Sequence, residues 1–335
     1  MVASEIKRKA LELGYTACGI IPASAFDEYK RYLDERVQAF PESKKLYETM
    51  YSFAQLPKNS KSIIVCTYRY NKYRIPDNLS PYIGKLYLVY EADPVTDEYE
   101  EYSAFNAYLK SAGINVLECN IPERWTAARA GLGKFGYNNF IYDPQHGSYI
   151  WIEHWVVDRE LEYDAIPENM YLPECGDHCQ RCVRECPTKA LSDSFSMNRG
   201  QCVAQLTYYA KDLPEDNIKE QMGSWLYGCD VCQDVCPCNA NKFQEMNEIP
   251  KLLGFKEFLS LENILVMDET FYLEHIYPRF DYAGKEGLWL WKCNALRAMI
   301  NSGEKMYHVL IKQCCNHEDA RIRKMAQWGC GNLGI

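Results

Sequence analysis

The chain has 335 residues, a formal net charge of −9 and 16 cysteines, with 47% apolar and 25% charged residues. This composition is that of an ordinary soluble globular protein of two or three packed units, and it excludes a disordered or fibrous chain. Neither a secretory signal nor an apolar run of the roughly 20 residues needed to cross a bilayer is visible. We therefore expect a cytoplasmic protein without membrane contact, whose reduced thiols need an explanation other than disulfides.

About the first 160 residues alternate helical and strand-like stretches, which predicts a mixed α and β domain. Helices are predicted over Ser4–Leu13, Glu101–Ser111 and Trp125–Ala130, a short apolar run over 17–21 ends at Pro22, and strands are predicted over Ser62–Tyr70 and Ile114–Cys119. Phe140–Tyr142 and Tyr149–Val157 are predicted to pair as a hairpin around residues 143–147.

From Pro167 to about Asn241 cysteines are dense and long periodic elements are scarce, so this segment should fold around something other than a large apolar core. Beyond Pro250, amphipathic helices are predicted over 289–301, 304–315 and 318–333, with faces that would stack as helical-repeat units. Asn316 and Asp319 are expected to form a capping box at the last helix. Residues 285–324 hold eight Lys or Arg against four acids, which is typical of a solvated basic face.

Two cysteine runs carry the chemistry, and each ends in C-x2-C-x3-C-P, at Pro187 and at Pro237. This ending matches the bacterial ferredoxin run, whose fourth cysteine ligates the other cluster of a pair. With that crossed pattern, one 4Fe-4S cluster would take Cys175, Cys179, Cys182 and Cys236, and the other would take Cys186, Cys202, Cys229 and Cys232. A zinc ribbon would lack the x3-C-P tails.

Some thiols lie outside these two sets. Cys238 is a spare thiol beside Cys236, and His178 inside the first run is a further possible ligand or a surface histidine. The remaining cysteines are expected to be free thiols that pack as small hydrophobic side chains: Cys18, Cys66, Cys119, Cys293, Cys314, Cys315 and Cys330.

Gly131, Gly133 and Gly136 satisfy G-x-G-x-x-G, the fingerprint of dinucleotide binding. That motif requires a strand before it and a helix after it, so that the pyrophosphate meets a helix N-terminus. Here the predicted order is reversed, and Gly131 is expected to end a helix. The pattern therefore disfavours NAD binding by this loop.

Three stretches together resemble the epoxyqueuosine reductases: residues 130–138 around the glycines, Gly147-Ser148, and the paired cysteine runs with Tyr227–Pro237. The resemblance covers about residues 115–245 and extends, more distantly, to the corrinoid-dependent reductive dehalogenases. It implies a nitroreductase-like α/β corrinoid-binding domain over 1–165, a ferredoxin-like double 4Fe-4S domain over 166–245, and a helical-repeat (HEAT-like) tail over 246–335, an α+β/α/β fold overall.

The same resemblance implies a cytoplasmic oxidoreductase. Two 4Fe-4S clusters would pass electrons from a low-potential donor, such as ferredoxin or flavodoxin, to cobalamin bound base-off. Gly131, Gly133, Gly136 and Asn138 would line the corrinoid-binding loop. The substrate would be a modified nucleoside or a small molecule, with tRNA as a partner that the overall charge of −9 disfavours.

The chain departs from the family at positions that bear on catalysis. Cys119 stands where the family has an Asp thought to donate a proton, and Tyr137 replaces a Lys or Arg. These two residues are the leading catalytic candidates, with Tyr142 and Glu123 behind them. Two alternative functions remain: an iron-sulfur electron carrier or binding protein without corrinoid chemistry, and a soluble reductive dehalogenase, which the missing twin-arginine signal disfavours.

Overall fold

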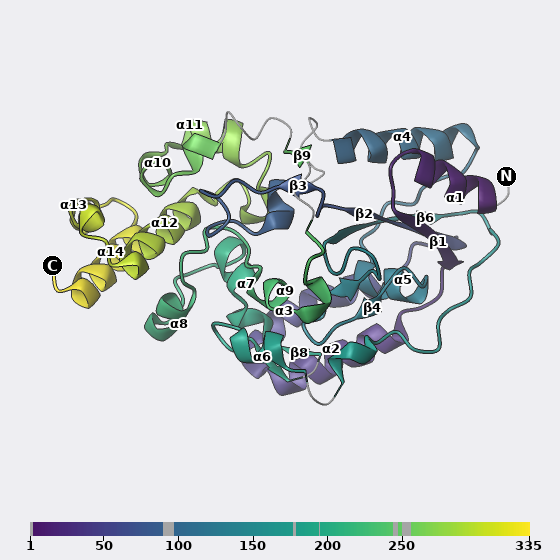
Figure 1. Cartoon of the computed structure of the whole chain (residues 1–335), viewed down its shortest axis with the longest axis horizontal. Helices are drawn as coiled ribbons and strands as arrows, with labels where there is room; N and C mark the ends of the chain where they lie inside the picture. The colour runs from purple at the N-terminus through teal and green to yellow at the C-terminus, as the bar shows by residue number, and fades with distance from the viewer. Residues whose placement is uncertain (1–2, 90–96, 177–178, 194, 244–246, 250–255) are drawn as a thin grey trace.

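The computed structural model of the chain describes residues 3–89, 97–176, 179–193, 195–243, 247–249 and 256–335. Its N-terminal part is built on an antiparallel sheet of order β1-β2-β6, from β1 (Ala17–Pro22), β2 (Ser62–Arg69) and β6 (Ile150–Val157). Helices cover both faces of this sheet (Figure 1). On one face lie α1 (Ala3–Glu12) and α4 (Asp97–Ser111), and on the other α2 (Asp27–Ala39) and α5 (Glu123–Arg129).

Strand β2 lies in the centre of this sheet and is buried from Ser62 to Tyr68 because both of its faces are covered. Successive side chains of a strand point to opposite faces. Ile63 and Val65 pack with α2 and α5, whereas Ile64 and Cys66 pack with α1 and α4. The continuous apolar run read from the sequence is thus a strand buried on both sides.

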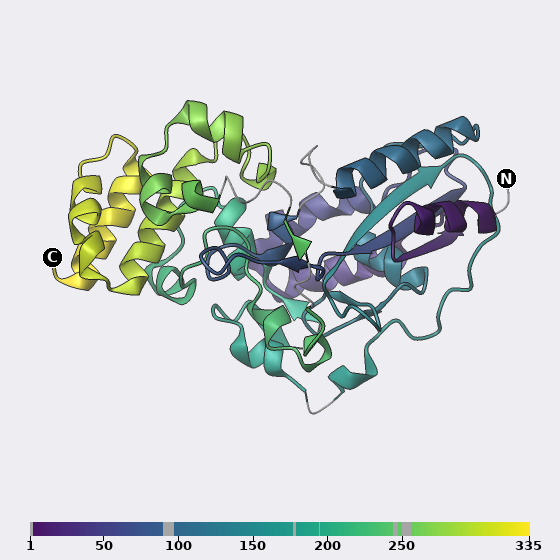
Figure 2. The same cartoon turned by 45° about the horizontal axis from the view of Figure 1, so that its top comes forward.

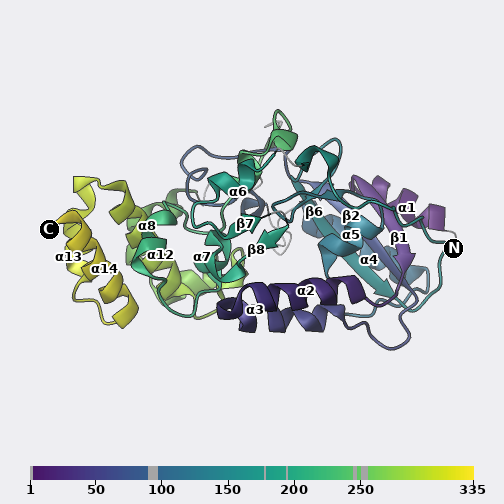
Figure 3. The same cartoon turned by 90° about the horizontal axis from the view of Figure 1, so that it is seen from below.

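The cysteine-rich segment is made of short elements, and it lies between the sheet and the C-terminal helices (Figure 3). Its elements are α6 (Arg181–Glu185), β7 (Leu191–Asp193), β8 (Ser196–Met197), α7 (Val203–Tyr208), α8 (Asp216–Gln221) and α9 (Val231–Asp234). The buried apolar groups of this segment are small: one contains Ala190 and Leu191, and another contains Val203 and Met222. The sequence prediction that this part lacks a large apolar core is confirmed.

The C-terminal helices stack at the end of the molecule opposite the N-terminus (Figure 2). They are α10 (Leu261–Val266), α11 (Glu269–Phe271), α12 (Leu288–Ser302), α13 (His308–Cys314) and α14 (Ala320–Leu333). Their core also contains Ile83, Leu88 and Tyr227. Segment 70–89 packs with the tail and not with the sheet. The division of the chain into three domains at residues 165 and 245 therefore stays a prediction.

The remaining elements are α3 (Lys44–Glu48), β3 (Tyr73–Arg74), β4 (Lys134–Phe135), β5 (Ile141–Tyr142) and β9 (Asn247–Glu248).

Two predicted strand arrangements are wrong. Residues 114–119 form a single bridge, Val116 to Val157, because the chain touches the end of β6 only briefly before it turns to Pro122 and α5. The hairpin of residues 140–157 does not form as a ladder: β5 pairs with β4, β6 pairs with β2, and only the Asp143–Gly147 bridge joins the two halves. Strand β6 finds a longer apolar partner in β2 than the two-residue β5 could offer.

The helix ends are partly as predicted. Gly113 and Gly131 follow α4 and α5 with φ of +67° and +73°, the left-handed conformation that ends a helix. The capping box at residue 316 is wrong, since Asp319 itself caps α14 by accepting the N–H of Arg321. The helix therefore begins three residues later than a cap at Asn316 would place it.

None of the helices in the described residues is long and apolar enough to cross a membrane.

Candidate functional site

The first cysteine run is shaped by short helical turns and a proline. Cys175 ends a 3-10 turn (Pro173–Cys175), Cys182 lies in α6, and Cys186 follows α6. Cys186 has extended backbone angles, φ −58° and ψ 117°, as expected for a residue that precedes proline. The chain therefore leaves α6 immediately after its last thiol. His178, the spare histidine of this run, lies outside the described residues.

The second run repeats this arrangement. Cys202 caps α7, Cys232 lies in α9, and Cys236 precedes the 3-10 turn Pro237–Asn239 with the extended angles φ −76° and ψ 124°. Helices α6 and α9 pack against each other. The two C-x2-C-x3-C-P endings are thus neighbours in space as well as similar in sequence.

The thiols fall into two neighbouring sets. Burial, together with the nearby thiols of Cys175, Cys236 and Cys179, raises the pKa of Cys182 to about 11. Burial also raises the pKa of Cys229, with added contributions from Cys202 and Cys186. Each set draws on both cysteine runs, which is the arrangement that crossed ligation requires.

Backbone N–H groups point at several of these sulfurs. The backbone N–H groups of Tyr137, Val183, Ala204 with Gln205, and Val231 lie near the sulfurs of Cys175, Cys182, Cys202 and Cys229, respectively, and each lowers the thiol pKa against the effect of burial. The thiolate is the form that binds metal, and amide donors to sulfur stabilise it. The residues present therefore fit thiolate-bound clusters.

A cavity of about 650 Å³ joins the first of these sets to the glycine loop. Gly131, Gly133 and Tyr142 form one wall, and Cys175, Cys179 and Cys236 form another. Charged side chains also reach it: Lys134, Asp143, Glu174 and Lys242. Cys238 lines the same cavity, and burial together with the neighbouring thiol of Cys236 raises its pKa to about 12.

Gly133 and Gly136 are required for steric reasons. A Cβ on Gly133 would lie 2.4 Å from Cγ2 of Ile141, and one on Gly136 would lie 2.5 Å from the ring of Tyr142. Both glycines thus allow the loop to pack closely on β5. The order is helix α5, then the glycines with β4 between them, as the reversed motif predicted.

Asn138 does not line the cavity but is buried beneath it. Its side-chain N–H donates to the hydroxyl of Tyr142 and to the carbonyl of Cys232, each at 2.9 Å. Of the four residues expected to line a corrinoid-binding loop, Gly131 and Gly133 face the cavity, while Gly136 and Asn138 support its wall.

The two leading catalytic candidates lie outside the cavity lining. The ring of Tyr137 packs edge-on against Phe195, with centroids 4.9 Å apart. Cys119 is half-buried, and its carbonyl lies 3.0 Å from Nε2 of His154, whose Nδ1 lies 3.2 Å from Glu123. Of the four residues named from sequence, Tyr142 is the one that lines the cavity.

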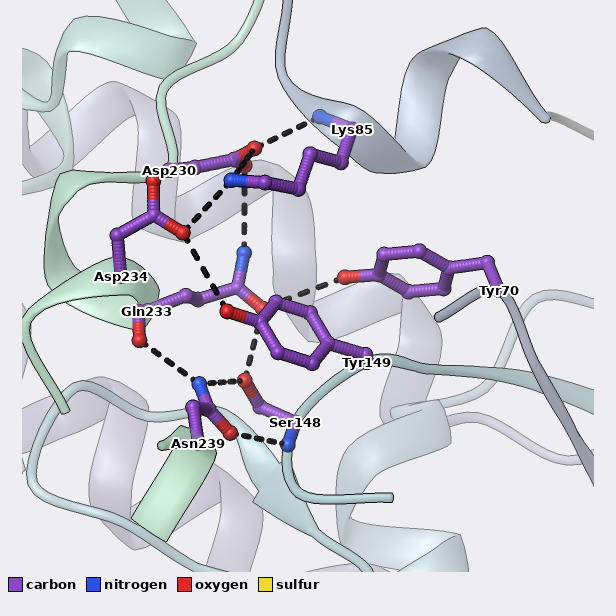
Figure 4. Close-up of polar contacts among 8 residues, drawn as sticks. All are labelled: Tyr70, Lys85, Ser148, Tyr149, Asp230, Gln233, Asp234 and Asn239. Carbon is purple, nitrogen blue, oxygen red and sulfur yellow. Dashed lines mark hydrogen bonds and ion pairs between the residues drawn. The ribbon is translucent and has the colours of Figure 1, made fainter. Parts of the chain in front are cut away.

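Polar side chains in the second cysteine run and directly after it attach this run to the sheet domain, as Figure 4 shows. Oε1 of Gln233 accepts from Ser148 at 2.9 Å and from Tyr70 at 3.3 Å. Asn239 donates to Ser148 at 2.8 Å and accepts its backbone N–H at 2.9 Å. The sequence analysis did not assign these residues a role; the signal was an unusual run of polar residues inside a ligand motif.

The thiols outside the two sets are free, as expected. Cys66, Cys293 and Cys314 are buried. The other four are half-buried but still pack against apolar clusters, as small hydrophobic side chains do: Cys18, Cys119, Cys315 and Cys330.

The basic face expected in the tail is also smaller than its composition suggested. Arg297 is 1% exposed and donates to Asn294 and to the carbonyl of Trp225. It therefore serves the packing of α12 and does not belong to a solvated face.

Comparison with known proteins agrees with this geometry. Residues 174–239 match a family described as a 4Fe-4S double cluster binding domain. An epoxyqueuosine reductase of Cyclobacterium marinum is 27% identical over 247 residues, 70% of this chain and 78% of the relative. One from Prochlorococcus marinus is 36% identical over 130 residues, 38% of this chain and 39% of the relative. The chain is similar in sequence to the epoxyqueuosine reductases.

Solved structures of epoxyqueuosine reductases have the same fold as this chain. A crystal structure of epoxyqueuosine reductase with an epoxyqueuosine-modified tRNA-Tyr stem loop matches with a TM-score of 0.77 at 23% identity, over 99% of this chain and 90% of that one. A catabolic reductive dehalogenase is distantly similar, with a TM-score of 0.42. The chain is an iron-sulfur oxidoreductase, and residues 174–239 match the double 4Fe-4S cluster domain.

Proposed function

We propose that the chain is a cobalamin-dependent reductase in which two 4Fe-4S clusters supply electrons to a base-off corrinoid. The observation that carries this proposal is the single cavity walled by the glycine loop on one side and by thiols of the first set on the other. A cofactor in that cavity would lie directly beside the first cluster. In this proposal the first cluster is held by Cys175, Cys179, Cys182 and Cys236, and the second by Cys186, Cys202, Cys229 and Cys232.

The position of the two sets supports an order of electron transfer. Thiols of the first set line the cavity, whereas those of the second set do not. The sets adjoin at Cys182 and Cys232, whose thiols interact electrostatically. Electrons from a low-potential donor such as ferredoxin or flavodoxin would enter at the second cluster and leave through the first. Cluster potentials of about −400 mV and below suit this task.

The corrinoid, when bound, would supply the metal-centred two-electron chemistry that cleaves the substrate bond. The chain would bind it in the nitroreductase-like part through Gly131 and Gly133, exclude water, and provide a proton. Tyr142 offers a hydroxyl at the cavity wall. Cys119 and Tyr137 remain the candidates from family position, and either would need to reach the cavity from behind its lining.

The substrate we propose is a small molecule or a modified nucleoside. A solved relative binds an epoxyqueuosine-modified tRNA stem loop, but this chain carries Cys119 where the family has a carboxylate. The charge of −9 and the burial of Arg297 disfavour broad phosphate contact. If tRNA is bound, its affinity should fall steeply with salt and with Lys312→Glu and Lys324→Glu, both exposed positions. Arg321 is a poorer test, because it pairs with Asp319 at 2.6 Å.

Anaerobic expression with cobalamin, followed by gel filtration and absorption spectroscopy, tests the proposal. We expect one corrinoid and eight irons to co-elute with each chain. Ala240→Trp would fill the cavity that Ala240 lines and should abolish corrinoid retention at full iron content. Ala104→Trp, on the exposed side of α4, is the matched control and should retain both. Iron-sulfur absorption with no corrinoid retained by the parent protein would instead establish an electron carrier.

A further inference from the structure

Lys85 reaches from the 3-10 turn Lys85–Leu88 to two carboxylates of the second cysteine run (Figure 4). Its Nζ lies 3.3 Å from Oδ2 of Asp230 and 2.6 Å from Oδ1 of Asp234. Its backbone N–H donates to the same Oδ2 of Asp230 at 2.7 Å. One residue thus holds Asp230 twice and Asp234 once.

These carboxylates alternate with proposed ligands. Asp230 lies between Cys229 and Cys232, and Asp234 lies between Cys232 and Cys236. The Asp230 side chain is 4% exposed, and that of Lys85 is 16% exposed. Asp230 is therefore a buried charge next to the second thiol set, and it contributes to the electrostatic environment of Cys229.

The surroundings favour this particular charge pairing. A Cβ on Gly84 would lie 3.1 Å from Oδ1 of Asp230, so the glycine leaves room for the carboxylate. Gln233 donates to the same oxygen at 3.4 Å. Tyr149 donates to Asp234 at 3.3 Å from the strand side of the interface. Because the buried carboxylate of Asp230 accepts several hydrogen bonds, it keeps its position as long as the Lys85 cation remains.

The charge next to a cluster affects how readily the cluster accepts an electron. Reduction adds one negative charge without adding a proton, so a nearby cation favours it and a nearby carboxylate opposes it. Charge and hydrogen bonding around the cluster are the protein's means of tuning its potential. Lys85 and Asp230 act on this balance in opposite directions.

We propose that Lys85 is a positioning residue that fixes Asp230 and Asp234 against the sheet domain and, by its charge, keeps the second cluster reducible by a low-potential donor. The inference rests on the ligand assignment proposed above and is independent of the corrinoid.

A redox titration with dithionite, monitored by electron paramagnetic resonance, tests this role, with each cluster taking up one electron. Lys85→Met keeps the aliphatic stem and removes the charge. We expect one of the two midpoint potentials to become more negative while the other is unmoved and iron stays at eight per chain. Asp230→Asn should move the same midpoint in the opposite direction, and the double variant should return close to the parent value.

Lys219→Met is the matched control, because Lys219 is also buried and pairs with Asp216 at 2.7 Å in the same segment without touching the cysteine runs. It should leave both midpoints unchanged. Lys85→Arg retains the charge, so its two midpoint potentials should stay near those of the parent. It remains an informative variant if Lys85→Met fails to fold. Equal midpoints in parent, Lys85→Met and Asp230→Asn at full iron content would overturn the inference. The ligand assignment itself would be overturned if a cysteine variant assigned to one cluster lost the iron of the other cluster.

Discussion

The side-chain amide of Asn138 donates to the carbonyl of Cys232 at 2.9 Å. This hydrogen bond connects the glycine loop, which walls the cavity, to a proposed ligand of the second cluster. The same amide group also donates to Tyr142, so a single buried side chain holds the cavity wall and the cysteine run in register.

Asn138→Ala should therefore destabilise the protein. It removes both hydrogen bonds and leaves the Cys232 carbonyl without this donor, which costs about 1–3 kcal/mol in the free energy of unfolding. Chemical denaturation of the cluster-loaded protein measures the loss. Asn332→Ala, at an exposed position with one 3.3 Å contact to Glu220, is the control and should change stability by less than about 0.5 kcal/mol. Equal stability of the two variants would contradict a structural role for Asn138.

The ligand assignment predicts how iron is lost. Cys182→Ala and Cys232→Ala each remove one ligand of a different cluster, so each should lower iron from eight to about four per chain, and the double variant should hold almost none. Metal analysis measures the iron content, and absorption spectroscopy follows the thiolate-to-iron charge-transfer bands.

Two further thiols provide controls for that experiment. Cys330→Ala, in the tail, and Cys238→Ala, beside Cys236, should both retain full iron. Loss of iron in Cys238→Ala would show that Cys238 is a ligand in place of Cys236.

Local features of the chain could be predicted from sequence because they depend on neighbouring residues. The apolar run of β2 and the glycines after α4 and α5 are of this kind, since strand burial and the left-handed helix end are local requirements. The crossed grouping of the thiols was predicted from the match of both C-x2-C-x3-C-P endings to the ferredoxin run, and as a ligand assignment it stays a prediction.

The pairing of strands and the burial of charged side chains could not be predicted in the same way. The partner of β6 is β2, more than 80 residues earlier in the chain, and nothing in the sequence of residues 140–157 distinguishes it from β5. Asp230 and Arg297 are residue types that are usually exposed, and only the fold brings Lys85 to one and the Trp225 carbonyl to the other. Buried charges at an interface between distant segments leave no periodic signal.

Cys119 should react slowly with alkylating reagents near neutral pH. Burial raises the pKa of its thiol above the ordinary value near 9, so the reactive thiolate is a small fraction at pH 7 and should grow about tenfold for each pH unit up to 9. Iodoacetamide labelling followed by mass spectrometry of the Cys119 peptide gives the rate at each pH. A rate that levels off below pH 8 would contradict this prediction and would make Cys119 a poor proton donor.

The stability contributed by Asp319 should depend on pH in a defined direction. Hydrogen bonding from the Arg321 side chain holds the pKa of Asp319 at about 2, below its ordinary value of 3.8. The lowered pKa means that the ionised form stabilises the fold above about pH 4 and that this contribution is lost as the pH falls from 4 toward 2. Since Asp319 also caps α14, Asp319→Ala should cost about 1 kcal/mol at pH 7. Urea denaturation of variant and parent at pH 7, 4 and 3 measures the free energy of unfolding. The difference in this free energy between the two proteins should become smaller as the pH falls. Glu304→Ala, at a turn without a side-chain cap, should show little difference at any pH, and a constant penalty for Asp319→Ala across the series would exclude a role for its charge.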